Sequence, residues 1–174
     1  MLASILFTTF FVSCQPKWIG KPAQGAWILQ DHASVCIEVS PDQLPKVVDA
    51  VKAWDRSLER WKKLHPRIGI DDSCDYTIKE VMPSPFDVGP NVLGAVPYLG
   101  SRDIFLYRGR YEVDALSVAL HEMGHALGAR HMEGTLMSPQ LESKLYVCPD
   151  SPTVAQVAVA NEVDPSLLSW CSFP

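Results

Sequence analysis

The sequence predicts one domain of the α+β class, in which short strands alternate with amphipathic helices. Several short stretches carry apolar side chains at alternate positions, as half-buried strands do. Two longer stretches repeat their apolar residues every three or four positions, as helices packed on a core do. The length of 174 residues, of which 47% are hydrophobic, fits one ordinary domain with a sizeable core.

The first strand is predicted at residues 33–39, and a helix with apolar residues at helical spacing follows from Leu44 to Leu64. Proline is tolerated only in the first turn of a helix, so Pro45 places the N-cap near Asp42. Four more strands are predicted, at 67–70, 76–81, 92–98 and 104–107.

The second helix begins near Asp114, a good N-cap residue, and carries the motif His-Glu-Met-Gly-His. Four residues of helix turn by about 400°, so His121 and His125 project from nearly the same side and can bind one metal ion. Gly128 can adopt the left-handed conformation that ends a helix, so that His131 returns as a third ligand. Three imidazoles leave one position of a tetrahedral zinc ion open, as catalytic sites do.

A tight segment at residues 135–139 can place Met137 beneath the three imidazoles. The pattern H-E-x-x-H-x-x-G-x-x-H followed by this methionine turn resembles the metzincin zinc endopeptidases, and most closely the matrixin catalytic domain. Segments 91–97, 102–107 and 114–120 follow the order and spacing of two matrixin strands and a helix start. The resemblance implies a mixed, mostly parallel twisted sheet of about five strands with two long helices, then the Met-turn and a C-terminal helix.

The resemblance also implies a zinc-dependent endopeptidase, in which His121, His125 and His131 bind one Zn²⁺. Glu122 is then the general base, which takes a proton from the zinc-activated water and later passes it to the leaving amine. The competing interpretation is a catalytically inert surface or binding protein that keeps a metzincin-like shell. Glu122 argues against it, because a purely structural metal site needs no general base.

In the family, an extended peptide adds to the edge strand that lines the cleft. That strand is predicted here at 92–98 and is closed by Pro97. The resemblance therefore implies that the backbone of Gly94, Ala95 and Val96 binds a protein or peptide substrate.

The loop at 140–150 is expected to form the wall of the pocket for the side chain after the scissile bond. Candidate lining residues are Leu141, Leu145 and Tyr146. Beyond it, Thr153 and Gln156 form a capping box for a final helix through Val163, and Pro165 terminates this helix.

Residues 1–14 are predicted to be a secretory or lipoprotein signal, since a short apolar run ends in Val-Ser-Cys before a polar linker. The protein is then either secreted or anchored to a membrane through a lipid on Cys14, and both outcomes place it outside the cytoplasm. Residues 15–33 are predicted to be an N-terminal arm, and 34–174 the metzincin-like catalytic domain.

The other cysteines are even in number, which in an exported chain predicts two disulfides with three possible connectivities. Sequence order favours Cys36–Cys74, which would tie the first strand to a later one, and Cys148–Cys171, which would bracket the last helix.

Other sites find less support. Calcium at residues 71–75 is possible, but the ordered ligand spacing is absent, and we interpret these carboxylates as caps of a turn. The structural zinc of matrixins is not expected, because only His32 and His65 remain. The cysteine-switch motif that keeps matrixins latent is absent, and we interpret Asp31 and Cys14 as ordinary residues rather than substitutes.

The net charge of −5 argues against nucleic-acid binding, and we expect a monomer.

Overall fold

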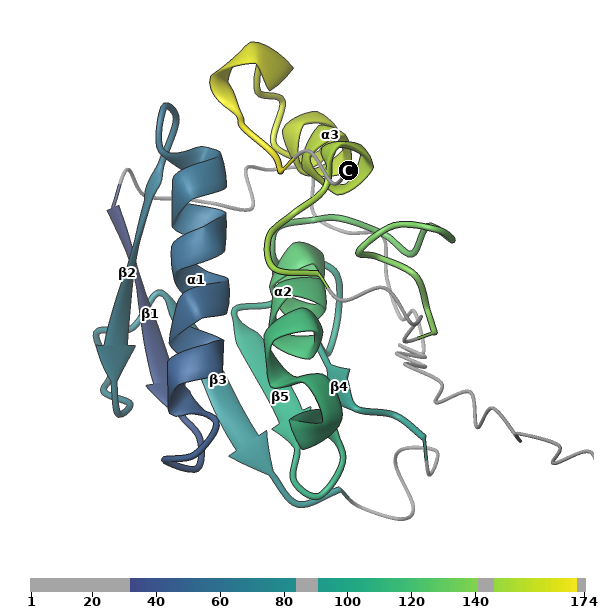
Figure 1. Cartoon of the computed structure of the whole chain (residues 1–174). Coiled ribbons are helices and arrows are strands. Elements are labelled where there is room, and N and C mark those ends of the chain that lie inside the picture. The colour runs from purple at the N-terminus through teal and green to yellow at the C-terminus, as the bar shows by residue number, and fades with distance from the viewer. Residues whose placement is uncertain (1–31, 84–90, 141–145, 172–174) are drawn as a thin grey trace, which may run out of the picture.

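The structure is a computed structural model that describes residues 32–83, 91–140 and 146–171 (Figure 1). A five-stranded sheet with the strand order β2-β1-β3-β5-β4 forms its centre. The strands are β1 (His32–Glu38), β2 (Lys63–Ile68), β3 (Tyr76–Val81), β4 (Gly94–Ala95) and β5 (Asp103–Tyr107). Neighbouring strands pair in parallel, except β4, which pairs antiparallel with β5. The predicted α+β class with a mostly parallel sheet is therefore confirmed.

The helices are α1 (Leu44–Leu58), α2 (Ala115–Ala126) and α3 (Ser151–Ala160), with 3-10 turns η1 (Tyr111–Asp114) and η2 (Pro165–Leu167). Figure 1 shows α1 and α2 side by side on one face of the sheet, against which both pack. Helix α3 lies past the C-terminal end of α2, where the Arg130 N–H donates to Gln156 Oε1 (2.9 Å). Among the described residues, no helix has the length and apolar character needed to cross a membrane.

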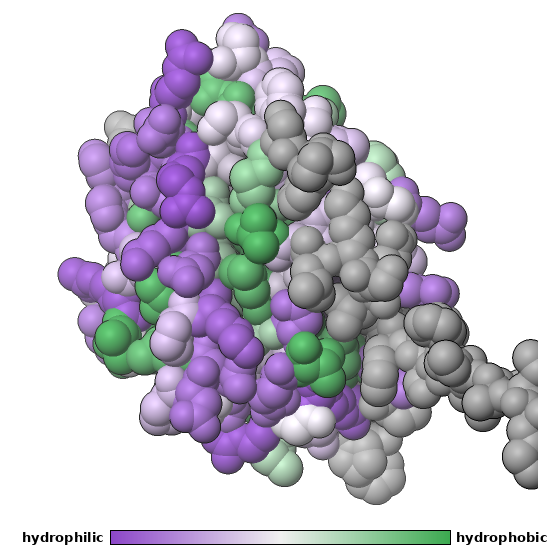
Figure 2. Space-filling view, in the orientation of Figure 1, coloured by the Kyte–Doolittle hydropathy of each residue, from purple (hydrophilic) through white to green (hydrophobic). Residues whose placement is uncertain are grey.

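Helix α1 is amphipathic, as predicted, but shorter than expected. It begins after Gln43, one residue beyond the predicted cap at Asp42, and ends at Leu58 rather than Leu64. Figure 2 shows that hydrophilic residues dominate the surface over α1 and β2, as the outward face of such a helix requires. The buried face consists of Val47, Ala50, Val51, Ala53, Trp54, Ser57 and Leu58.

Strand pairing explains why the predicted first helix was too long. Strand β2 begins at Lys63, before the predicted segment 67–70, and pairs with β1. Leu64 is buried in this strand, so its apolar side chain fits the helical and the strand pattern equally well. Its N–H donates to Asp55 Oδ1 (2.8 Å), which fixes the turn after α1. Pro66 is tolerated because β2 is an edge strand.

The other strands lie close to their predicted positions. β3 is confirmed at both ends, β1 is displaced by one residue at each end, and β5 begins one residue earlier than predicted. At the opposite edge, only Gly94–Ala95 form β4, so most of the predicted segment 92–98 is not strand and Val96 lies outside it. The Leu93 carbonyl still accepts the Tyr107 N–H (2.9 Å).

Helix α2 begins and ends as the sequence predicts. The Asp114 side chain accepts the Ser117 N–H (3.3 Å), which makes Asp114 the N-cap. The last helical residue is Ala126. Gly128 has φ +98°, and its N–H donates to the His125 carbonyl (3.0 Å), so the left-handed turn predicted there is present.

Helix α3 begins earlier than predicted, because Asp150 rather than Thr153 is its N-cap. Asp150 Oδ1 accepts the Thr153 N–H (3.1 Å). Gln156, the second residue of the predicted capping box, bonds to the chain that follows α2. The helix ends at Ala160, before Val163, and Pro165 begins η2 instead of terminating the helix.

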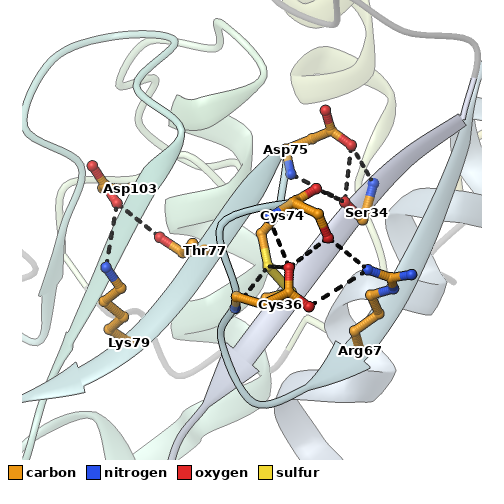
Figure 3. Close-up of a disulfide and its surroundings, with 10 residues drawn as sticks. Ser34, Cys36, Arg67, Cys74, Asp75, Thr77, Lys79 and Asp103 are labelled. Carbon is orange, nitrogen blue, oxygen red and sulfur yellow. Dashed lines mark hydrogen bonds and ion pairs between the residues drawn. A yellow bond between two sulfur atoms is a disulfide. The ribbon is translucent and has the colours of Figure 1, made fainter.

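Both favoured disulfides are present. Cys36–Cys74 joins β1 to the loop before β3, with Cα atoms 5.8 Å apart (Figure 3). Cys148–Cys171 joins the segment before α3 to the C-terminal segment, with Cα atoms 6.1 Å apart. The open choice among three connectivities is thereby resolved.

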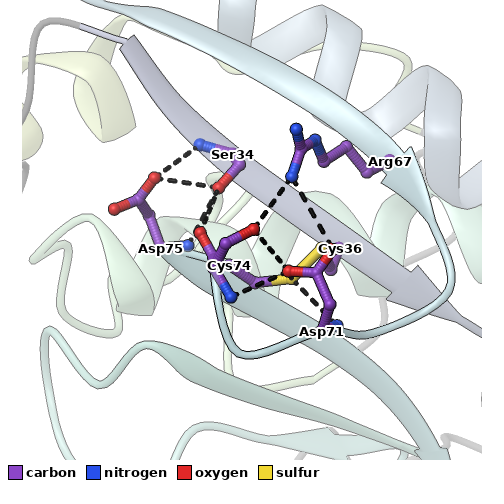
Figure 4. Close-up of polar contacts among 7 residues, drawn as sticks. Ser34, Cys36, Arg67, Asp71, Cys74 and Asp75 are labelled. Carbon is purple, nitrogen blue, oxygen red and sulfur yellow. Dashed lines mark hydrogen bonds and ion pairs between the residues drawn. A yellow bond between two sulfur atoms is a disulfide. The ribbon is translucent and has the colours of Figure 1, made fainter.

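The oxygen-rich loop beside the first disulfide is a network of hydrogen bonds (Figure 4). Asp75 Oδ2 accepts the Ser34 N–H (2.8 Å), and Asp71 Oδ1 accepts the Ser73 N–H (2.8 Å). Asp71 also lies 3.7 Å from the Arg67 guanidinium. These carboxylates therefore cap backbone N–H groups, as the turn interpretation predicts.

Several predictions fall outside the described residues. They are the signal at 1–14 with its Cys14, the arm as far as residue 31, and the pocket candidates Leu141 and Leu145. The last residues assigned to the arm, His32 and Ala33, lie in β1.

Candidate metal centre

The three predicted histidines come together at the C-terminal end of α2. His121 and His125 lie one helical turn apart, with ring centroids separated by 4.7 Å. After the turn at Gly128, His131 places its ring 4.7 Å from that of His125 and 5.4 Å from that of His121. One ring nitrogen from each residue lies within 4.8 Å of the others, so the group could hold a metal ion.

Main-chain carbonyls fix the orientation of the two buried imidazoles. His121 Nδ1 donates to the Leu136 carbonyl (2.8 Å), and His125 Nδ1 donates to the Ala129 carbonyl (2.8 Å). A carbonyl oxygen can only accept, so Nδ1 carries the proton and Nε2 carries a lone pair. Metal-binding histidines typically have this second hydrogen bond, which fixes the tautomer and the ring direction.

The Nε2 atoms have the positions that a metal ion requires. His121 Nε2 is buried and has no hydrogen-bond partner in the described part of the chain. His125 Nε2 and His131 Nε2 are 3.1 Å apart. Ligand nitrogens on a tetrahedral zinc ion are separated by about 3.3 Å when each bond is about 2.0–2.1 Å. A buried, unpartnered acceptor such as His121 Nε2 is costly unless it binds a cation, so these residues fit a metal.

The surroundings keep all three imidazoles neutral. Burial lowers the pKa of His121 well below its ordinary value of 6.5, and the neighbouring His125 lowers it further. Burial, followed by the proximity of His131, lowers the pKa of His125 to about 4. Burial also lowers the pKa of His131. The neutral form is the one that binds metals, so protons compete weakly for this site near neutral pH.

Glu122 is fully buried and faces β4. A Cβ atom placed on Gly94 would lie 2.9 Å from both Cγ and Oε1 of Glu122, and 3.0 Å from the Phe105 carbonyl. Only glycine leaves room for the carboxylate at this position. Gly94, predicted to bind substrate through its backbone, therefore also packs directly against the predicted general base.

Met137 lies where the methionine turn is predicted, fully buried beneath α2. A Cβ atom on Gly124 would lie 2.5 Å from Met137 Sδ and 3.6 Å from the Trp54 ring. Trp54 Nε1 donates to the Leu120 carbonyl (3.0 Å), which fixes α1 against α2. Gly124 thus lets methionine and tryptophan contact the backbone of the helix that carries the histidines.

One side of the centre reaches solvent. His121 and His125 are buried, whereas His131 is exposed. The three residues predicted to bind substrate differ in their surroundings. Gly94 is buried and Ala95 is half-buried, both in β4, whereas Val96 is buried and lies outside the strand. Tyr146 is also buried, and its main chain bonds to the Ser117 hydroxyl.

Other potential ligands in the described residues are differently arranged. Cys36, Asp71 and Cys74 lie within metal-binding distance of one another, but the two sulfurs form a disulfide. His32 and His65 are exposed, and one ring donates a hydrogen bond to the other across 3.2 Å. Within residues 32–83, 91–140 and 146–171, no third potential ligand lies close enough to this pair to form a group of three.

Sequence reasoning missed three residues that support the centre: Gly124, Trp54 and Asp150. Gly124 lies inside the motif at a position where any residue is allowed, so spacing gave no signal. Trp54 lies at the helical spacing of the apolar residues between Leu44 and Leu64, which predicts burial but not its contact with α2. Asp150 precedes Ser-Pro, a helix-start pattern that could have identified it as the N-cap of α3.

No protein-family model matches this chain, and the curated proteins include none with significant similarity to it.

Proposed function

We propose that this chain is a zinc-dependent endopeptidase of the metzincin type, with the matrixin catalytic domain as the nearest resemblance. The observation that carries the proposal is the convergence of three imidazole Nε2 atoms, two of them oriented by main-chain carbonyls. Three neutral nitrogen ligands with one side open to solvent are typical of catalytic rather than structural zinc. The mostly parallel sheet with two helices on one face is compatible with the metzincin fold.

A bound zinc ion supplies a water of lowered pKa and polarises the substrate carbonyl. His121, His125 and His131 would hold it, and Glu122 would accept the proton of the attacking water. Glu122 would then donate that proton to the leaving amine, so that the peptide bond breaks with the charges balanced. Burial of Glu122 against Gly94 keeps the carboxylate in one position, as general base catalysis requires.

The substrate we propose is an extended polypeptide that pairs with β4. This strand is the edge of the sheet, and its neighbour on the inner side is β5. A peptide could add beyond it by main-chain hydrogen bonds, which grip the chain without reading its sequence. Gly94 would bring the peptide backbone close to Glu122.

An extracytoplasmic location is part of the proposal. Two disulfides in the described residues are what an oxidising compartment produces. The signal predicted at residues 1–14, with or without a lipid on Cys14, would provide the export.

The decisive experiment is cleavage of a mixed peptide library by purified protein, with metal analysis of the same sample. We expect one zinc per chain, cleavage that a chelator abolishes, and a loss of at least about 10³-fold in turnover for Glu122→Ala with zinc retained. His125→Ala should lose the metal as well.

Each contrary result has a distinct meaning. Wild type that is fully zinc-loaded yet inert on the library would replace the peptidase with a binding protein. Protein that binds no metal after incubation with zinc would overturn the proposal altogether.

A further inference from the structure

Asp150 makes more contacts than a helix cap needs. Its side chain is buried, with 6% of the residue exposed. Oδ1 accepts the Thr153 N–H (3.1 Å) and thereby caps α3. Oδ2 accepts the Leu136 N–H (2.9 Å), a bond that contributes nothing to the helix. The same carboxylate therefore ties α3 to the methionine turn.

Leu136 connects this carboxylate to the metal centre. Its N–H binds Asp150, and its carbonyl accepts the proton of His121 Nδ1 (2.8 Å). A shift of Leu136 would move that carbonyl, and with it the direction of the His121 ring. No other described side chain donates to or accepts from the Leu136 main chain.

The rest of the turn is held from its other side. Thr135 Oγ1 donates to the Met132 carbonyl (2.7 Å) and accepts the Met137 N–H (3.1 Å). The Met132 N–H in turn donates to the Met137 carbonyl (2.9 Å). The turn is closed on itself by these bonds, so Asp150 is the contact that fixes the closed turn relative to α3.

The end of the chain restrains the position of Asp150. Cys148, two residues earlier, is bonded to Cys171. The Cys171 N–H donates to the carbonyl of Pro149, the residue next to Asp150 (3.1 Å). The carboxylate therefore lies on a short segment held by a disulfide, a hydrogen bond and the first turn of α3.

We propose that Asp150 is a positioning residue for His121: through Leu136 it fixes the tautomer and direction of the imidazole that binds the metal. This inference rests on the proposed metal centre. Groups that orient a metal ligand typically contribute 10-fold to 100-fold to metal affinity. The negative charge adds to the effect, because it polarises the hydrogen bonds that lead to His121.

The test separates positioning from capping. Asp150→Ser keeps an N-cap oxygen for Thr153, since serine is a good cap, but its single short hydroxyl cannot also reach Leu136. Asp150→Asn keeps the shape but leaves an amide N–H₂ where one acceptor stood. Asp164→Ser is the matched control, because Asp164 caps η2 through the Ser166 N–H (2.9 Å) away from the histidines.

Zinc affinity of the full chain is measured by competition with a chelator, and the ligand field by the visible spectrum of the Co²⁺-substituted protein. We expect Asp150→Ser and Asp150→Asn to bind zinc at least about 10-fold more weakly and to change the cobalt spectrum, and Asp164→Ser to match wild type. If wild type binds zinc and both Asp150 variants bind it within about twofold with the same spectrum, Asp150 is only a cap.

Nitrogen NMR of the metal-free protein gives a second readout, in case the serine variant does not fold. Wild type should show His121 protonated at Nδ1, and Asp150→Asn should shift this tautomer equilibrium. An unchanged tautomer in that variant would overturn the inference. A wild type without zinc affinity would instead overturn the proposed metal centre, which is a separate result.

Discussion

The ligand atoms of two groups of side chains in the described residues lie close enough to hold a metal ion, but the neighbouring contacts keep these atoms available in only one of the groups. In the histidine group, main-chain carbonyls take up the Nδ1 protons of His121 and His125 and leave the Nε2 lone pairs directed inward. In the cysteine group the potential ligand atoms are already engaged in other bonds. Cys36 and Cys74 share a bond, and Asp71 accepts from Ser73 (Figures 3 and 4).

The difference shows that proximity of ligand atoms does not define a site. In both groups the potential ligand atoms lie within 4.8 Å of one another. Only the histidine group has neighbours that preserve the binding form of its ligands, at His121 and His125. The cysteine group instead ties β1 to the loop before β3, and its contribution should be to stability alone.

Removal of the first disulfide should have the largest effect on stability and none on metal binding. For Cys36→Ala with Cys74→Ala, 38 residues apart, we expect the free energy of unfolding to fall by about 4 kcal/mol, because the unfolded chain gains freedom. Urea unfolding gives the loss, and chelator competition should give an unchanged zinc affinity.

The second disulfide provides the comparison, because its removal should affect both stability and zinc binding. Cys148→Ala with Cys171→Ala opens a shorter loop, with a separation of 23, and should cost about 3 kcal/mol. Because it flanks Asp150, its removal should also weaken zinc binding. Equal zinc affinities in the two double variants would show that the end of the chain has no influence on the centre.

Gly124→Ala should damage the histidine group and leave the cysteine group intact. The new Cβ would lie 2.5 Å from Met137 Sδ, so the methionine or α2 must move. Overpacking of this kind costs about 1–3 kcal/mol, which thermal unfolding would measure. Zinc affinity should fall as well, whereas Gly109→Ala, where a Cβ meets nothing within 4 Å, should leave it unchanged although its φ of +78° is strained.

Acid should distinguish the two groups in metal-free protein. The pKa of His125 is lowered to about 4 from 6.5, so below pH 6.5 the unfolded chain binds more protons than the folded chain. Stability is therefore present above pH 6.5 and is lost as the pH falls from 6.5 toward 4. The free energy of unfolding, measured by urea unfolding with chelator present, should drop by about 1–2 kcal/mol between pH 7 and pH 5. His125→Gln should reduce this slope, and the lowered pKa values of His121 and His131 account for the remainder.

The cysteine group should respond in another pH window. The pKa of Asp71 is lowered below 3.8, by the hydrogen bonds from Ser73 and to a lesser degree by Arg67. Its contribution is thus retained down to about pH 4 and disappears only in stronger acid. A slope between pH 7 and pH 5 that survives replacement of His121, His125 and His131 together by Gln would contradict this division.

Local signals explain what the sequence could predict. The helix of the motif, its cap at Asp114 and its end at Gly128 depend on residues close together in the chain, and all three are confirmed. Cysteine order likewise favoured the pairs that form. The spacing of three histidines predicted a group that the fold brings within reach of one ion.

Tertiary contacts explain what it could not predict. Leu64 fits a helix or a strand, and only its pairing with Ala33 decides between them. Thr153 and Asp150 are both acceptable caps; Asp150 caps α3 through the Thr153 N–H, and its second oxygen accepts the Leu136 N–H from another part of the chain. The role of Gly124 depends on Met137, which approaches from another part of the chain.

The missing side chain at Gly94 has a consequence for any polypeptide lying along β4. The carboxylate of Glu122 sits directly behind the main chain of that strand, with no side chain between them. In the proposed peptidase, the position of a bound peptide and that of the proton acceptor would both depend on this glycine. A bound peptide shifted by one residue would then place a different bond beside Glu122, so the sheet edge would determine which peptide bond the proposed enzyme cleaves.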